Sequence, residues 1–69
     1  MVEIFKTDVI KKNKANEILT ELQHEFPNLK INFDLDDCDR ILRVEGQGIA
    51  VEQIISRMRA QNHSCELLE

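Results

Sequence analysis

The sequence has no tryptophan, no tyrosine, one proline and two glycines, and it has no long apolar run. A helix that spans a bilayer needs about 20 consecutive apolar residues, and charged residues interrupt every stretch of that length here. An N-terminal leader with basic residues followed by an apolar segment is absent as well. These absences predict a protein with no membrane association, and we expect it in the cytoplasm.

Two cysteines, Cys38 and Cys65, are too few for a small secreted scaffold held together by several disulfides. We therefore expect both to be free thiols. Cys65 lies in a strand-like run, where a free cysteine packs as a small hydrophobic side chain. Cys38 lies among aspartates, whose negative charge disfavours the thiolate, so it is not predicted to be an activated nucleophile.

What the chain does contain is an ordinary mixture of apolar and charged residues. Of its 69 residues, 42% are hydrophobic and 32% are charged, and the formal net charge is -4. This composition is typical of a folded domain rather than a disordered tail, and the length predicts one domain that spans residues 1–69. The acidic balance argues against non-specific nucleic-acid binding, which needs a basic face.

Two apolar patterns with a helical period predict two amphipathic helices. The first has Asn13 as its expected N-cap and stops before Pro27. The second follows the "EGQG" breaker and ends near Asn62, a residue that tolerates the left-handed conformation. The apolar positions are Ala15, Ile18, Leu19, Leu22 and Phe26 in the first pattern, and Val51, Ile54, Ile55 and Met58 in the second.

Strand-like runs lie before, between and after the helices, at residues 2–9, 29–35, 40–45 and 63–68. The order of elements is β-α-β-β-α-β. Two helices on one face of a four-stranded antiparallel sheet are the usual arrangement for this order, so we predict a ferredoxin-like α+β sandwich. The right-handed crossover rule then brings three connections to one end of the sheet: "VIKKNK", "DLDDCD" and "QNHS".

The alternation of side chains along the strands also predicts the face of the sheet that the helices leave open. If Phe5 and Thr7 point toward the helices, Ile4 points away from them, and Ile41 does the same on a neighbouring strand. A pair of exposed isoleucines usually has no significance. Such a pair can also be the start of a homodimer contact or a docking site, so we expect a monomer or a weak homodimer.

Three lysines lie where the first helix begins, although the N-terminus of a helix favours anions. One interpretation is that they face the acidic connection across the shared end, where a network of ion pairs is worth more than an exposed pair. The other is that all these charges are simply solvated. The candidate binding residues at this end are Lys11, Lys12, Lys14, Asp36, Asp37, Cys38 and His63.

The pattern V-x-K-x-x-K-A-x-x-I-L-x-x-L, which begins at Val9, resembles the heavy-metal-associated domains of copper chaperones and metal-transporting ATPases. In that family the loop reads Met-x-Cys-x-x-Cys, so Val9 takes the methionine position, and Lys11 and Lys14 take the positions of the two cysteines. The segments "INFDL" and "AQNHSCEL" are similar to the family's second strand and its last helix-to-strand passage. The resemblance implies the ferredoxin-like fold and a metal site that has lost its ligands.

This substitution has a chemical consequence, because a lysine ammonium group has no lone pair and repels cations. Lys11 and Lys14 therefore predict a chain without a metal or other cofactor. We expect a non-catalytic binding module that meets a protein partner or a small anionic ligand at its lysine loop. The alternative is a metal-binding or metal-trafficking protein with relocated ligands, among them Cys38 and His63, since a thiolate and an imidazole suit zinc or copper.

Two other functions are known for domains with this order of elements. RNA-recognition domains stack bases on aromatic side chains of their central strands, and "RILRVEG" has none. Acylphosphatases use an arginine and an asparagine on phosphate, and Asn13 with the nearby lysines is a possible anion site. No nucleophile or base accompanies it, so we expect neither nucleic-acid binding nor an enzyme.

Overall fold

The structure, a computed structural model, describes residues 1–35 and 40–68. It confirms the predicted order of six elements. They are β1 (Val2–Thr7), α1 (Lys12–Glu25), β2 (Lys30–Asp34), β3 (Ile41–Glu45), α2 (Val51–Ala60) and β4 (Cys65–Leu68). Within the described ranges, no helix has the length and apolar character needed to cross a membrane.

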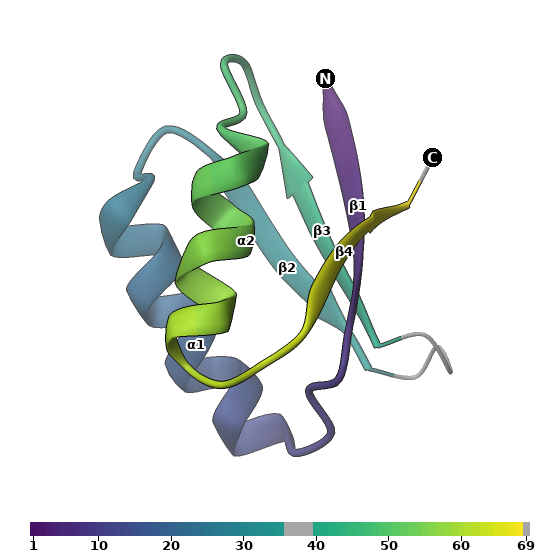
Figure 1. The fold of residues 1–69 in the computed structure, drawn as a ribbon. Helices are drawn as coiled ribbons and strands as arrows, with labels where there is room; N and C mark the ends of the chain where they lie inside the picture. The colour runs from purple at the N-terminus through teal and green to yellow at the C-terminus, as the bar shows by residue number, and fades with distance from the viewer. Residues whose placement is uncertain (36–39, 69) are drawn as a thin grey trace.

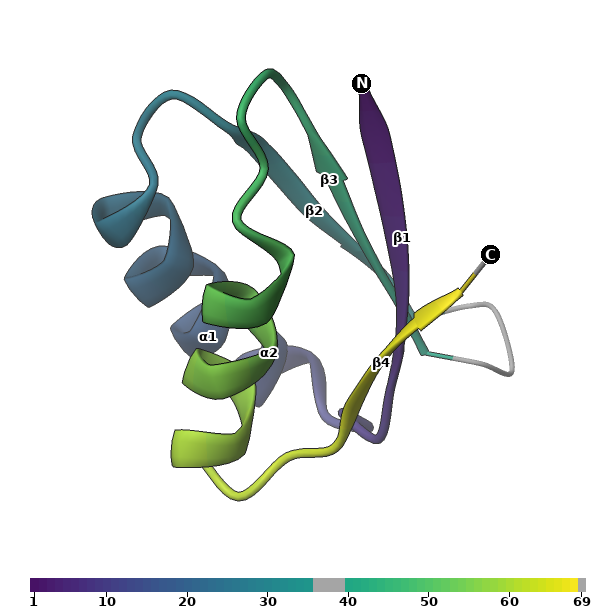
Figure 2. The same ribbon diagram turned by 45° about the horizontal axis from the view of Figure 1, so that its top comes forward.

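The strands form a single antiparallel sheet in the order β2-β3-β1-β4. Figures 1 and 2 show both helices on the same side of this sheet. The fold is therefore the predicted ferredoxin-like α+β sandwich. Because β1 is a central strand, the N-terminal strand is hydrogen-bonded on both sides. The connections that follow β1 and α2 lie at the same end of the sheet (Figure 1).

The core fills the space between the sheet and the helices, with the side chains that alternation predicted. Phe5, Leu42 and Val44 from the central strands are fully buried. The helices contribute their apolar stripes, of which Ile18, Leu22, Ile54 and Met58 are the most buried members. Cys65 is a buried free thiol in the same cluster, so its predicted place in the core is confirmed.

The start of α1 differs from the prediction. Lys11, not Asn13, is the N-cap: its backbone is extended, and its carbonyl oxygen accepts a hydrogen bond from the Ala15 N–H at 3.0 Å. Asn13 lies inside the first turn, where its side-chain oxygen accepts a hydrogen bond from the neighbouring Lys14 N–H at 2.9 Å. The expected N-cap was therefore wrong by two residues, because Asn13 uses its side chain locally.

β1 and β4 are shorter than predicted. The Thr7 N–H and hydroxyl both donate to the Arg40 carbonyl oxygen, at 3.1 and 2.6 Å. The Val9 N–H then donates to the Thr7 hydroxyl oxygen at 3.3 Å instead of to a neighbouring strand, so the chain leaves the sheet after Thr7. Val9 is still fully buried, as alternation predicted. At the other terminus, β4 begins at Cys65 rather than at residue 63.

The end of α2 confirms the predicted role of Asn62. This residue has a φ of 66°, and its N–H donates to the Arg59 carbonyl oxygen at 2.9 Å. The His63 N–H donates to the Met58 carbonyl oxygen at 3.1 Å, which completes a Schellman motif. The motif turns the chain sharply, so that His63 lies beside the segment that follows β1.

Candidate functional site

The described parts of the three connections meet at one end of the sheet, as the topology predicted. Figure 1 shows the β1–α1 and α2–β4 connections toward the lower end of the molecule, the end at which β2 stops and β3 starts. Two sets of contacts join them. Asp8 contacts His63 on one side of β1, and Thr7 is hydrogen-bonded to Arg40 on the other. The described residues of the three connections therefore lie at the same end of the sheet, as predicted.

The Asp8 carboxylate binds the α2–β4 connection through one oxygen. Its Oδ1 atom lies 2.9 Å from His63 Nδ1 and accepts a hydrogen bond from the Ser64 N–H at 3.1 Å. A carboxylate can only accept hydrogen bonds, so His63 donates from Nδ1. The neutral imidazole then carries its lone pair on Nε2. This pair of contacts fixes the tautomer and the orientation of the ring.

The environment of Asp8 lowers the pKa of its carboxyl group below the usual value of 3.8. Partial burial is the largest single influence on this pKa and acts to raise it. The hydrogen bonds from His63 and from the Ser64 backbone, together with the positive charge of His63 when its ring is protonated, outweigh burial and stabilise the ionised form. Asp8 is therefore a carboxylate throughout the neutral range.

Beside this pair, the surface has a hollow of about 300 Å³. Lys11, Lys14 and His63, all of them predicted site residues, share it. Lys14 also forms an exposed ion pair with Glu17, with 3.6 Å between Nζ and Oε2. Besides these four, the lining residues are Asp8, Ile10 and Asn13. Ile10 is 69% exposed, so the hollow combines two ammonium groups and the carboxylates of Asp8 and Glu17 with an exposed apolar side chain.

Lys12, the third predicted lysine, lies elsewhere. It lines a second hollow, of about 510 Å³, between α1 and the ends of β2 and β3. Asp34 and Arg40 line this hollow too, as do the apolar Phe33 and Leu35. Neighbouring positions on a helix point in different directions, so the side chains of Lys11 and Lys12 diverge. The three lysines therefore surround the start of α1 without converging on one point.

The N-terminus of α1 has no acidic residue in its first turn and no side-chain cap. Its first turn instead contains Lys12 and Lys14, next to Lys11 at the N-cap. The partial positive charge of the helix dipole and the ammonium groups therefore add together at this end. These positive charges repel cations and attract anions. They also destabilise the helix, because like charges meet at its N-terminus.

Three of the predicted site residues, Asp36, Asp37 and Cys38, lie outside the described residues. The predicted network between the lysines and the acidic connection therefore stays a prediction, as does any role of Cys38. Within residues 1–35 and 40–68, no group of three or more histidine, cysteine or acidic side chains is arranged to hold a metal ion.

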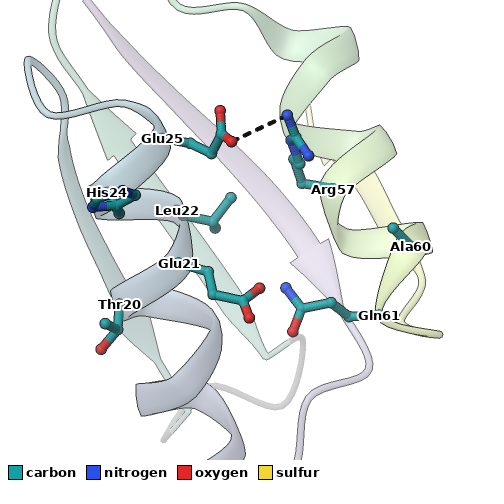
Figure 3. Close-up of a pocket in the computed structure, with 8 residues that line it drawn as sticks. All are labelled: Thr20, Glu21, Leu22, His24, Glu25, Arg57, Ala60 and Gln61. Carbon is teal, nitrogen blue, oxygen red and sulfur yellow. Dashed lines mark ion pairs between the residues drawn. The ribbon is translucent and has the colours of Figure 1, made fainter.

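A third hollow, of about 380 Å³, lies between the two helices and was not predicted from the sequence. Figure 3 shows Leu22 at the centre of this groove and Glu21 and Gln61 pointing toward one another across it. An ion pair joins Glu25 Oε1 to Arg57 Nη2 at 3.2 Å. Both charged side chains are about half exposed, so the pair is worth at most about 1 kcal/mol.

Asp8 is the residue that sequence reasoning missed. Its partner His63 is 55 positions away, so no local pattern connects the two. The available signal was topological: Asp8 directly follows the central strand β1, and His63 lies two residues before β4, the strand that pairs with it. No protein-family model, curated protein or solved structure matches this chain.

Proposed function

We propose that this protein is a non-catalytic binding module that holds an acidic group of a partner protein at its lysine-rich end, the surface around Lys11, Lys14 and His63 at the start of α1. The observation that carries the proposal is that Lys11 and Lys14, at the start of α1, and His63, in the α2–β4 connection, line one hollow. A carboxylate placed there meets two ammonium groups and the positive end of the helix dipole, which act against the Asp8 and Glu17 carboxylates of the same hollow. The exposed Ile10 at the same hollow favours a peptide ligand, which presents apolar atoms next to its charge.

The cost of the lysines supports a binding role. A cation in the first turn of a helix is unfavourable by about 0.3–1 kcal/mol. The chain has more acidic than basic residues, and acidic residues in this turn would stabilise the helix. A bound anion offsets the unfavourable charge, because it interacts with the lysines and with the N–H groups of Lys12 and Asn13 at the start of the first turn.

The chemistry of the described residues supports a binding module over an enzyme. An Asp–His pair activates a nucleophile only if a hydroxyl or thiol lies within hydrogen-bond reach of the imidazole. Within the described ranges, no hydroxyl or thiol group is hydrogen-bonded to His63. Cys65, two residues away, is buried in the core, and burial raises the pKa of its thiol to about 11 although the charge of Arg59 acts to lower it. Such a thiol is inert at neutral pH.

The proposal includes the origin of the site as a heavy-metal-associated loop in which lysines replaced the ligands. Lys11 lies at the N-cap of α1 and Lys14 in its first turn, and both line the same hollow. Two cysteines at these positions would be able to grip one ion. Two lysines at these positions still line one hollow, but their positive charge attracts anions instead of cations.

One observation favours the alternative, a metal site that includes His63. A histidine that ligates a metal usually donates its other ring N–H to a carboxylate, which orients the ring. Asp8 and His63 have this arrangement through Nδ1, with Nε2 left for a ligand. Cys38 is the thiol that the sequence offers at this end, and a cysteine with a histidine suits zinc.

Calorimetry with hexaglutamate and with inorganic phosphate as probes tests the binding proposal. We expect saturable binding of hexaglutamate that weakens about fivefold in Lys11→Glu and in Lys14→Glu, which corresponds to about 1 kcal/mol for each lost contact. Lys30→Glu is the matched control, since Lys30 is an exposed lysine at the far end of β2. Equal loss in all three variants would mean a non-specific charge effect and would reject the site. Binding of phosphate alone, without hexaglutamate, would reject a peptide ligand.

Zinc titration of the reduced protein distinguishes the alternative. Tight one-to-one binding that is lost in both His63→Ala and Cys38→Ser would establish the metal site and reject our first choice. Weak binding that is unchanged in these variants would reject the alternative.

A further inference from the structure

The outer edge of β2 is open in the structure. Among residues 1–35 and 40–68, β2 pairs with β3 on one side and with no strand on the other. The hydrogen bonds from the Thr7 N–H to the Arg40 oxygen and from the Gly46 N–H to the Met1 oxygen flank β3 at its two ends. They show that the even-numbered positions of β3 bond to β1.

The alternation of an antiparallel ladder then determines where each main-chain group of β2 points. The odd-numbered residues of β3 bond to β2, and their partners there are the even-numbered residues of β2. Ile31 and Phe33 lie between these partners, so their N–H and C=O groups point to the open edge. Main-chain groups at an open edge are a template for the addition of another strand.

The carbonyl oxygens on either side of this segment already have donors. Gln23 Nε2 donates to the Leu29 oxygen at 2.6 Å, and the Leu29 N–H is hydrogen-bonded within its own turn. At the other end, Arg40 Nη1 donates to the Leu35 oxygen at 2.9 Å. The open part of the edge is therefore centred on the four main-chain groups at positions 31 and 33.

A second copy of β2 satisfies these four groups in one antiparallel register. If Ile31 of one copy pairs with Phe33 of the other, each N–H donates to the opposite C=O. The two-fold axis then passes between the two Asn32 residues. A shift of two residues in either direction leaves one pair unsatisfied, because Ile31 or Phe33 then meets Leu35 or Leu29, whose carbonyl oxygens are occupied. A shift of one residue would set exposed side chains against buried ones.

The side chains of β2 match in the same register. On the exposed face of the sheet, Lys30 of each copy lies directly opposite Asp34 of the other, and the two Asn32 side chains lie opposite each other. These are non-hydrogen-bonded pairs, in which the side chains approach most closely. On the helix face, the apolar Ile31 and Phe33 meet. The edge is therefore complementary to itself in main-chain groups, in charge and in apolar surface.

The helix layer leaves room for this contact. Two helices about 10 Å in diameter cover the same width as four strands about 4.8 Å apart. A second copy in the same sheet therefore places its α1 about one helix diameter from the first α1. The side chains at the middle of α1 that line its hollows with β2 include Asn16, Thr20 and Gln23, which are uncharged, so no like charges meet there.

We propose that this protein forms a two-fold homodimer by pairing the β2 strands of two copies edge to edge, which joins their sheets into one. Main-chain hydrogen bonds supply the affinity, and reciprocal Lys30–Asp34 pairs select the register. A five-residue edge with one helix beside it is smaller than a standard interface of about 800 Å² per partner, so the dimer is weak and transient. We expect a dissociation constant of about 0.1 mM. The hollow at the lysine-rich end is lined by α1 and by the β1–α1 and α2–β4 connections, so it stays accessible in the dimer.

Charge exchange tests the register. Sedimentation equilibrium between 0.01 and 1 mM should show dimerisation of the wild type. Lys30→Asp or Asp34→Lys alone should weaken it about tenfold or more, because each places like charges at both symmetric contacts. A mixture of the two single variants should form heterodimers with an affinity within about threefold of the wild type, since each copy then meets opposite charges on its partner.

Arg59→Asp and Glu52→Lys are the matched controls, because they make the same changes of charge at exposed positions of α2. Both should dimerise as the wild type does. Single variants on β2 that behave like these controls, or a mixture that binds no more tightly than the single variants, would overturn the proposed register.

Amide hydrogen exchange tests the edge itself. The N–H groups of Ile31 and Phe33 gain a ladder partner only in the dimer, so their exchange should slow about fivefold between 0.01 and 1 mM protein. The N–H groups of β4, on the opposite edge of the sheet, should exchange at a rate that does not depend on concentration. A wild type that is monomeric at 1 mM, or a dimer that leaves the exchange at positions 31 and 33 unchanged, would overturn the proposal.

Discussion

His63 Nδ1 lies 2.9 Å from Asp8 Oδ1, and this contact joins the segment after β1 to the segment before β4. The same carboxylate oxygen accepts the Ser64 N–H. Asp8 thus positions one wall of the hollow that Lys11 and Lys14 also line. The carboxylate is a positioning group for the site, and its own charge limits how strongly the site attracts an anion.

Asp8→Ala should lower the free energy of unfolding by about 0.5–1.5 kcal/mol at pH 7, because two hydrogen bonds to a half-exposed carboxylate are lost. The pKa of Asp8 is lowered in the folded state, so its contribution is present above the unfolded value of 3.8 and is lost as the pH falls through the folded pKa. Urea unfolding at several pH values measures this difference. Asp34→Ala, at an exposed aspartate of β2, is the control, and a deficit in Asp8→Ala that stays constant down to pH 2.5 would contradict the assignment.

Lys12→Glu should raise the free energy of unfolding by about 0.3–1 kcal/mol at low salt, because it replaces a cation by an anion in the first turn of α1. The gain should shrink as salt screens the dipole. Thermal unfolding of Lys12→Glu and of Lys30→Glu, at an exposed lysine outside the helices, compares the two. A destabilised Lys12→Glu would show that Lys12 makes a favourable contact and would remove the stability argument for a binding role.

Cys65 should resist thiol reagents in the folded protein. In a Cys38→Ser background, modification at pH 8 should proceed only as fast as the protein opens, since the thiol is buried. Burial raises the pKa of this thiol from 9.0 to about 11. The protein should therefore lose stability as the pH rises through this window, where the unfolded thiol ionises and the folded one does not. Rapid stoichiometric modification without denaturant would place Cys65 on the surface instead.

Gly46→Ala and Gly48→Ala form a matched pair in the connection between β3 and α2. Both glycines have positive φ values, 148° and 65°. A Cβ at Gly46 would lie 2.7 Å from Leu29 Cδ2, whereas one at Gly48 would meet no atom within 4 Å. We expect a loss of about 1–2 kcal/mol for Gly48→Ala from backbone strain alone. The loss should be larger for Gly46→Ala, where Leu29 must also move. Chemical denaturation compares the two, and equal losses would mean that Leu29 moves aside without cost.

The sequence was sufficient to predict the order of the elements and the buried face of each. Leu42 and Val44 alternate with Ile41 and Arg43, and this period of two indicates which face the helices cover. The position of Asn62 was predictable for a similar reason, because few residues other than glycine tolerate its backbone conformation. These features depend on local geometry, which a short stretch of sequence contains.

The features that the sequence did not indicate depend on tertiary contacts. β1 ends at Thr7 because the Thr7 hydroxyl group bonds to Arg40, 33 positions away. The helix begins at Lys12 because the Lys11 carbonyl oxygen accepts the first helical hydrogen bond, from the Ala15 N–H. Asn13 therefore lies inside the first turn, although asparagine is a favoured N-cap residue. Lys12 lies apart from the other two lysines, and the position of the ends of β2 and β3 determines which side chains share its hollow.

The most direct test of the lysine-rich end is a ¹H–¹⁵N chemical-shift titration of the folded protein with hexaglutamate. We predict saturable shifts at the N–H groups of residues 11–14 and 63–64, and no comparable shifts at residues 46–48, which connect the strands and helices at the other end of the sheet. Saturable shifts centred on another surface, or no saturable shifts at the lowest practical salt concentration, would contradict the proposal that this end of the fold binds an acidic partner.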